Sequence, residues 1–230
     1  MLHKLEAVVN IAILFLAVWI GWRMIHPPEP TASSGAGAIT ERKEGPPPSI
    51  PIPLTGYAKR GNADAAVALL EYSDFQCPYC RAFALNTLPA LQQKYIATGK
   101  VLFVFAEFPL ENVHSSALSA ASAAECAGEQ GKFWEMHDLL FKTQTELADF
   151  EAHAAVLHLH ASAFSKCIAS MPTAIRIAEV AARRVAVSGT PTFFIGKIQR
   201  DGTLKVTKRL TGSLPIGSFI RALDPLLGGT

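Results

Sequence analysis

The spacing of hydrophobic residues changes along the chain, and each change marks a predicted element. Residues 67–72 (VALLEY) form a largely apolar run, which is typical of a central strand buried on both faces. Between residues 77 and 97 the apolar positions recur at helical spacing, and Pro89 is expected to kink this helix. Residues 101–105 (VLFVF) predict a second buried strand. Strand, helix and strand in this order indicate a parallel pair with a right-handed crossover.

The second half of the chain begins with alanine-rich helical periodicity. This pattern covers about residues 114–187 and predicts a block of helices. Strand patterns return at residues 192–195 and 205–211, separated by an Asp-Gly turn, and a last helix is expected over residues 215–227. The order of these elements predicts one α/β domain with a mixed sheet and an inserted helical block.

The N-terminal residues have a different character. The stretch AVVNIAILFLAVWIGW is apolar apart from one Asn and is long enough for about four helical turns. We expect residues 1–26 to form a transmembrane or signal-anchor helix that tethers the chain to a membrane. The alternative is a signal peptide cleaved after Ala38, but this small-residue site lies farther beyond the apolar run than cleavage sites usually do.

Composition limits what the rest of the chain can be. Residues 27–53 are rich in Pro, Gly and Ser and predict an extended linker, so the folded domain is expected over residues 54–230. The chain has 230 residues, of which 50% are hydrophobic and 17% charged, enough for one substantial core. Its formal net charge of +2 is too small to indicate a nucleic-acid partner. Four cysteines are too few for a small fold built on disulfides.

Two of the cysteines lie close together in the segment DFQCPYCRAF, where the predicted strand meets the predicted helix. At the start of a helix, Cys77 would meet unpaired backbone N–H groups and the positive end of the helix dipole. Both stabilise the thiolate, which is the form that attacks disulfides. Cys80 follows one turn later, after Pro78 and Tyr79, and is placed to close a reversible disulfide with Cys77. The spacing therefore predicts a redox-active dithiol.

Three segments together resemble the DsbA-like thiol-disulfide oxidoreductases, the DsbA-type branch of the thioredoxin superfamily. They are LLEYSDFQCPYC, AECAGEQGKFWEMHDLLF and SGTPTFFIG, and the resemblance extends over about residues 61–227. It implies a thioredoxin-like fold, in which helices flank a mixed central sheet and a helical domain is inserted. It also implies thiol-disulfide exchange on proteins outside the cytoplasm.

The resemblance assigns roles, by position, to residues of the predicted site. Cys77 corresponds to the attacking cysteine and Cys80 to the resolving one. Pro191 corresponds to a cis-proline beside the dithiol, and Thr190 to the residue before it. Glu71 corresponds to a buried acid, whose pKa burial would raise and which could relay a proton to Cys80. An exposed carboxylate at the edge of the sheet is the alternative for Glu71.

The dipeptide between the cysteines affects the expected direction of the reaction. Tyr79 stands where typical DsbA proteins carry His. The change removes one donor to the thiolate and predicts an oxidant of intermediate strength. The same CPYC motif occurs in glutaredoxins, so a reducing role stays open.

The other two cysteines, Cys126 and Cys167, lie on separate predicted helices. Some DsbA-like proteins have a second, non-catalytic disulfide in the helical insertion, and the resemblance implies such a structural bridge here. Two separate buried thiols are the alternative. A zinc site of four cysteines usually needs a second close pair, which the chain lacks. We expect no metal and no cofactor besides the dithiol.

These features predict a membrane-tethered thiol-disulfide oxidoreductase that forms disulfides in exported proteins. Its domain would lie outside the cytoplasm, in the periplasm or at the cell surface, or would be released there if the N-terminal segment were cleaved. Its expected partners are exported proteins with thiols and a membrane redox protein that restores the dithiol. The alternatives are a disulfide reductase or isomerase of the same fold, and a tethered binding or chaperone module whose cysteines are structural.

Overall fold

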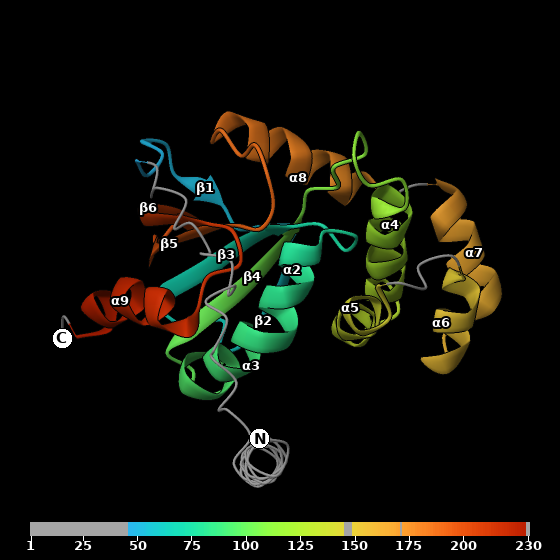
Figure 1. Cartoon of the computed structure of the whole chain (residues 1–230), viewed down its shortest axis with the longest axis horizontal. Coiled ribbons are helices and arrows are strands. Elements are labelled where there is room, and N and C mark those ends of the chain that lie inside the picture. The colour runs from blue at the N-terminus through green and yellow to red at the C-terminus, as the bar shows by residue number, and fades with distance from the viewer. Residues whose placement is uncertain (1–45, 145–148, 171, 229–230) are drawn as a thin grey trace, which may run out of the picture. The chain divides into compact units, whose positions relative to one another are not determined.

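The computed structural model describes residues 46–144, 149–170 and 172–228. Within these residues the centre of the fold is a six-stranded sheet with the order β1-β6-β5-β3-β4-β2 (Figure 1). The strands are β1 (Ile52–Pro53), β2 (Ala58–Arg60), β3 (Val67–Ser73), β4 (Val101–Glu107), β5 (Thr192–Ile198) and β6 (Thr203–Thr211). The helices are α2 (Pro78–Ala82), α3 (Leu88–Leu91), α4 (Ala117–Gly128), α5 (Phe133–Lys142), α6 (Phe150–Val156), α7 (Ala161–Ser170), α8 (Thr173–Arg184) and α9 (Ile216–Leu227), with π-helical segments η1 (Phe83–Thr87) and η2 (Gln92–Ile96).

The two predicted buried strands, β3 and β4, lie side by side in the middle of the sheet. They are parallel, with Val67 opposite Val101 and Ser73 opposite Glu107. β5 pairs with the other side of β3 in the antiparallel direction, so the predicted mixed α/β sheet is confirmed. All residues of β3 and β4 are buried, because helices cover both faces of the sheet (Figure 1). Burial on both faces explains why these strands are continuous apolar runs.

The alternation of side chains along the strands divides the core into two clusters. Leu69 and Phe103 belong to the cluster on the face covered by α9 and by the helical run that follows the dithiol. Leu70 and Val104 belong to the cluster on the opposite face, which α8 covers. The dithiol belongs to the first of these clusters and therefore packs on the same face of β3 and β4 as Leu69 and Phe103.

The segments α2, η1, α3 and η2 form a helical run over most of the range predicted as one helix. Within it, the N–H of Leu88 bonds the carbonyl of Phe83, five residues earlier, which makes η1 a π-helical segment. This wide turn comes directly before Pro89, which has no N–H and whose ring crowds the preceding turn. Pro89, where the sequence predicts a kink, thus lies between two π-helical segments.

Between β4 and β5 the chain forms α4 to α8, where the sequence predicts a helical insertion. In Figure 1, α4, α5, α6 and α7 lie together, whereas α8 returns to the sheet. A disulfide joins Cys126 of α4 to Cys167 of α7, with a Cα–Cα distance of 5.7 Å. The structural bridge implied by the resemblance is therefore present.

The sequence pattern does not predict the edge strands β1 and β2. They have two and three residues, which is too short for alternation to show. Ile52 of β1 pairs with Leu204 of β6 and is 1% exposed, although it lies in the range predicted as linker. β2 pairs with β4 in the antiparallel direction and covers the edge that β4 would otherwise present.

The predicted membrane helix over residues 1–26 lies outside the residues that the structure describes, as does most of the predicted linker. No helix in the described ranges is both long and apolar enough to cross a membrane. The N-terminal tether stays a prediction.

Candidate active site

The dithiol lies where β3 ends and α2 begins, at the junction that the sequence predicts. Asp74 shapes the turn between them: its Oδ1 accepts the N–H of Gln76 at 2.7 Å, and its carbonyl accepts the N–H of Cys77 at 3.1 Å. Both cysteines are free thiols. Cys77 caps α2 and is 3% exposed, whereas Cys80 lies within α2 and is 0% exposed. Cys77 is therefore the sulfur that a partner can reach first.

Hydrogen bonds to its sulfur stabilise the thiolate of Cys77. The thiol of Cys80 has the largest effect, and the side chain of Thr190 and the backbone N–H groups of Cys80 and Tyr79 add to it. Together they outweigh burial and lower the pKa of Cys77 from 9.0 to about 6. At neutral pH this cysteine is mostly the thiolate, which is the reactive form.

Cys80 has the opposite property. Burial raises its pKa well above the usual value, and its hydrogen bond to Cys77 and the negative charges of Cys77 and Glu71 raise it further. The side chain of Ser73 also hydrogen-bonds the Cys80 sulfur, which acts in the lowering direction but is the smaller effect. Cys80 therefore keeps its proton when Cys77 has lost its own. This division suits an attacking thiolate next to a resolving thiol.

The loop before β5 lies next to the dithiol. Its Thr190–Pro191 peptide bond is cis, as the resemblance implies. The Sγ atom of Cys77 lies 3.5 Å from the carbonyl oxygen of Thr190, although the two residues are 113 positions apart. The hydroxyl Oγ1 of Thr190 is buried and, within the described residues, has no hydrogen-bond partner while Cys77 is a thiol. This hydroxyl is free to donate to the thiolate.

Glu71 lies in the interior and not at an exposed edge of the sheet. It is 1% exposed, and the hydroxyl of Ser73 donates a hydrogen bond of 2.7 Å to its Oε1 atom. Burial raises the pKa of Glu71 from 4.5 to about 8, because the hydrogen bond from Ser73 offsets only part of the loss of solvation. At neutral pH this acid is therefore mostly protonated, and at higher pH, where it ionises, its negative charge raises the pKa of Cys80.

Pro78 and Tyr79 form the exposed surface next to the two sulfurs. Pro78 begins α2, where its missing N–H costs nothing. Tyr79 is 64% exposed. A partner that approaches Cys77 would therefore also contact the exposed ring of Tyr79.

A reactive cysteine, a buried second cysteine and a cis-proline loop thus meet at the end of a central parallel strand. The family model described as "Thioredoxin" matches residues 55–209, which include all of these features. The chain belongs to the thioredoxin family.

Its relatives place this thioredoxin-family chain in the DsbA-like branch. The crystal structure of α-DsbA1 from Wolbachia pipientis has 26% identity and a TM-score of 0.65, and the similarity covers 77% of this chain and 94% of that chain. A probable disulfide bond formation protein D from Bacillus anthracis is 37% identical over 84 residues, which are 36% of this chain and 39% of that protein. The resemblance found in the sequence is confirmed.

A curated relative with higher identity has a different name. The Na(+)/H(+) antiporter NhaA 1 from Salinispora arenicola is 41% identical over 161 residues, which are 68% of this chain and 24% of that protein. This thioredoxin-family chain thus spans about a quarter of the length of the first curated relatives. The name antiporter describes a much longer protein than the segment that the two share.

Two contacts of the thioredoxin-family site are not predicted from the sequence. Gln144, which follows α5, donates from Nε2 to the carbonyl oxygens of Phe75 at 2.6 Å and of Cys77 at 3.0 Å. The Nδ1 atom of His114 lies 2.8 Å from Oδ2 of Asp74, in the turn before the dithiol. Both contacts join residues that are distant in sequence, so no local pattern marks them. They hold the turn that carries Cys77.

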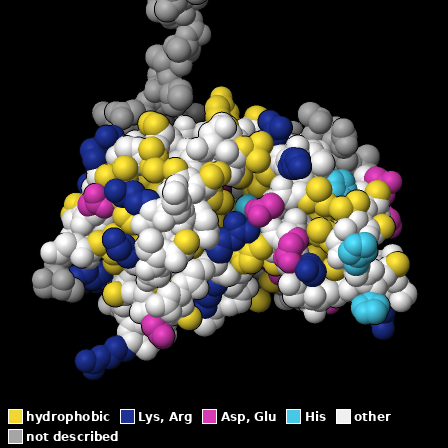
Figure 2. Space-filling model, turned by 90° about the horizontal axis from the view of Figure 1, so that it is seen from below, with side chains coloured by type: hydrophobic (Ala, Val, Ile, Leu, Met, Phe, Trp, Pro, Cys, Tyr) yellow, Lys and Arg dark blue, Asp and Glu magenta, His cyan; other side chains and the backbone are white. Residues whose placement is uncertain are grey.

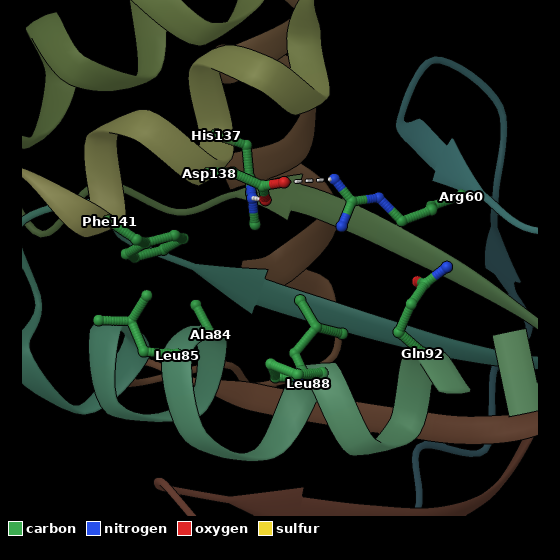
Figure 3. Close-up of a pocket in the computed structure, with 9 residues that line it drawn as sticks. Arg60, Ala84, Leu85, Leu88, Gln92, His137, Asp138 and Phe141 are labelled. Atoms are coloured by element: carbon green, nitrogen blue, oxygen red, sulfur yellow. Dashed lines mark hydrogen bonds and ion pairs between the residues drawn. The ribbon is translucent and has the colours of Figure 1, made fainter. Parts of the chain in front are cut away.

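A separate cavity of about 260 Å³ lies between α5 and the helical run after the dithiol (Figure 3). Leu85 and Phe141 contribute apolar walls, and an ion pair of 3.0 Å between Arg60 and Asp138 contributes a polar part. Neither cysteine of the dithiol lines this cavity. The exchange chemistry therefore does not take place in it.

Among the described residues, charged groups and metal ligands are the features that could form a further site. On the face shown in Figure 2, Lys and Arg side chains are interspersed with Asp, Glu and apolar side chains and do not form one basic surface. Across the residues with a described placement, no group of three or more His, Cys, Asp or Glu residues could hold a metal ion. Because Cys126 and Cys167 are joined to each other, the four sulfurs are not available to one zinc ion.

Proposed function

We propose that this chain is a thiol-disulfide oxidoreductase that forms disulfides in exported proteins. The observation that carries the proposal is the unequal acidity of two neighbouring thiols. Cys77 has its pKa lowered to about 6, mainly by the hydrogen bond from Cys80, whereas burial holds the pKa of Cys80 well above its usual value. A low pKa makes Cys77 both a reactive thiolate and a good leaving group.

The proposed reaction starts from the oxidised dithiol. A substrate thiolate attacks the sulfur of Cys77, a bond forms between these two sulfurs, and Cys80 leaves as a thiolate that takes up a proton. A second substrate thiolate then attacks the substrate sulfur of this mixed disulfide. The substrate disulfide closes, and Cys77 leaves as its stabilised thiolate. Glu71, which is buried and carries a proton at neutral pH, is the acid proposed to supply the proton to Cys80.

The expected oxidising strength is intermediate. Thiolate pKa values are about 7 in thioredoxin and about 3.5 in DsbA, and the value of about 6 for Cys77 lies between them. One pKa unit corresponds to about 1.4 kcal/mol, or about 30 mV for this two-electron couple. A reduction potential of about −240 mV follows if thioredoxin, at about −270 mV, is the reference. Because the value lies nearer to thioredoxin than to DsbA, a reductase or isomerase is the second candidate function.

We propose that the domain works outside the cytoplasm, in the periplasm or at the cell surface, tethered by a membrane helix over residues 1–26. The disulfide between Cys126 and Cys167 supports this, because such bonds are typical of oxidising compartments. The dithiol itself is the proposed redox group, with no further cofactor. A membrane redox protein would return it to the oxidised state after each turnover.

The test uses the full chain in its oxidised form and a reduced peptide with two cysteines. The wild type is expected to oxidise the peptide, and the Cys77→Ala variant is expected to be inactive. The Cys80→Ala variant, mixed with the oxidised peptide, is expected to accumulate a mixed disulfide through Cys77, because the resolving thiol is missing. A measured potential at or below that of thioredoxin would move the assignment to the reductase. An intact Cys77–Cys80 disulfide that never exchanges with the peptide would refute both candidates.

A further inference from the structure

A second buried acid, Glu107, lies near the dithiol and has no role in the reaction as described so far. It is the last residue of β4, is 2% exposed, and faces Ser73 in the pairing of β4 with β3. Neither of its carboxyl oxygens has a hydrogen-bond partner among the residues that the structure describes. An unpaired carboxylate in the interior is costly, so the group is held in its protonated form.

Ser73 is the register neighbour of Glu107 and lies within hydrogen-bond reach of the Cys80 sulfur. Its hydroxyl is buried, donates to Oε1 of Glu71 at 2.7 Å, and also hydrogen-bonds the Cys80 sulfur. Because residues 71 and 73 lie on the same face of β3, and Glu107 is in register with Ser73, the three side chains leave the sheet on one face, near its end. A hydroxyl can donate one hydrogen bond while it accepts another, so it can pass a proton along such a chain.

Glu125 of α4 is an acid near enough to act on Glu107 electrostatically and is itself partly exposed. Among neighbouring charges, Glu125 acts most strongly on the pKa of Glu107, followed by Asp74 and Glu71. Glu125 is partly exposed, and burial raises its pKa to about 7, with a smaller contribution from Glu129. A carboxyl group with this pKa exchanges protons with water readily at neutral pH.

The remaining titratable groups around Glu107 come from two other segments. Asp74, in the turn after β3, is paired with His114 at 2.8 Å. On the α5 side, the ring of His137 packs on Phe105 of β4 with a centroid distance of 4.8 Å. Burial lowers the pKa of His137, so this ring is neutral at pH 7 and adds no positive charge to this side of β4.

We propose that Ser73 and Glu107 complete a proton path that links the sulfur of Cys80, through Glu71, to Glu125 at the surface. The inference rests on the proposed thiol-disulfide exchange. When substrate attacks Cys77, the Cys77–Cys80 bond breaks and Cys80 leaves with the electron pair. The Cys80 thiolate takes the proton of the Ser73 hydroxyl as Ser73 takes one from the carboxyl group of Glu71. Glu107 then returns a proton to Glu71, and Glu125 replaces it from solvent.

The test measures proton uptake and sulfur exchange in the same single-turnover reaction. The oxidised full chain is mixed with a reduced two-cysteine peptide between about pH 5 and pH 9, and acid quenching followed by alkylation gives the exchange rate. An indicator dye gives the net proton change, and subtracting the protons that the peptide thiols lose gives the uptake at Cys80. Loss of a proton relay is expected to slow the step by about a hundredfold, the low end for acid–base groups. The Glu107→Gln variant keeps the shape of the side chain but carries no acidic proton, so its uptake should lag behind exchange and its pH profile should change.

Matched variants separate the relay from a structural role. Ser73→Ala is expected to slow sulfur exchange as much as Glu107→Gln does. Ser73→Thr, which keeps the hydroxyl, is expected to exchange at the wild-type rate. Glu179→Gln removes a buried carboxyl group on α8, on the other face of the sheet, and is expected to leave the pH profile unchanged. If Glu107→Gln does not fold, the comparison of Ser73→Ala with Ser73→Thr decides.

Two results have distinct meanings. Wild-type rates, proton uptake and pH profile in both Glu107→Gln and Ser73→Ala would overturn the proton path while leaving the proposed function intact. A wild-type protein that does not exchange with the peptide would instead refute the proposed function.

Discussion

The hydroxyl of Thr190 offers a direct test of how the fold sets the acidity of Cys77. It is buried and, in the described part of the chain, unpartnered while Cys77 is a thiol, and its side chain lowers the pKa of Cys77 as a donor. Thr190→Val replaces this hydroxyl with a methyl group and keeps the branched shape of the side chain. The substitution therefore removes one donor to the thiolate with little change in packing.

The expected magnitude follows from the contact. A hydrogen bond to a charged group contributes about 1.5 kcal/mol or more, which is about one pKa unit. The pKa of Cys77 should therefore rise from about 6 to about 7 in the variant. At about pH 6.5 the thiolate fraction should fall from roughly three quarters to roughly one quarter. The reduction potential should become more negative by about 30 mV, because the reduced form loses the same free energy.

Two measurements check this prediction. Thiolate absorbance at 240 nm, recorded against pH, gives the pKa of Cys77, and equilibration with glutathione gives the potential. Thr190→Ser keeps the hydroxyl and serves as the matched control, with values expected close to those of the wild type. Identical titration curves for the wild type and Thr190→Val would show that the hydroxyl does not stabilise the thiolate.

The remaining predictions concern stability. Replacing both Cys126 and Cys167 with alanine is expected to lower the free energy of unfolding by up to about 4 kcal/mol, because the bridge closes a loop with a sequence separation of 41. Urea titration measures this loss, and an unchanged unfolding free energy would contradict it. Glu71→Gln is expected to remove a pH dependence of the free energy of unfolding. The pKa of Glu71 is about 8 in the folded chain against 4.5 for an exposed group. The wild type therefore has the full contribution of this group to stability below pH 4.5 and loses it as the pH rises through 8. Between these values the variant should gain about 1.4 kcal/mol per pH unit relative to the wild type in urea unfolding, and parallel curves for the two proteins would argue against a raised pKa.

Much of the fold could be predicted because its main elements carry local patterns. The runs at residues 67–72 and 101–105 are continuous and apolar because β3 and β4 are buried on both faces. Helical periodicity over about residues 114–187 predicts the inserted block in the same way. The two edge strands were missed because a strand of two or three residues has no period to detect.

The sequence also determined which residues could carry the chemistry. The spacing of Cys77 and Cys80 at a strand-to-helix junction indicates a dithiol without any knowledge of the fold. The resemblance to DsbA-like proteins added Glu71, Thr190 and Pro191. It left open whether Glu71 lies at an exposed edge or in the interior, because alternation along one strand does not say what covers each face.

Only the tertiary structure decided how acidic each of these groups is. The carbonyl and side chain of Thr190 come from a loop 113 residues away, and Gln144 and Glu107 come from other elements again. Burial raises the pKa of Glu71 above that of an exposed acid. The groups around each sulfur lower the pKa of Cys77 and raise that of Cys80. The physical reason is that solvation and hydrogen bonding depend on every group within a few ångströms, and packing, not sequence order, chooses those groups.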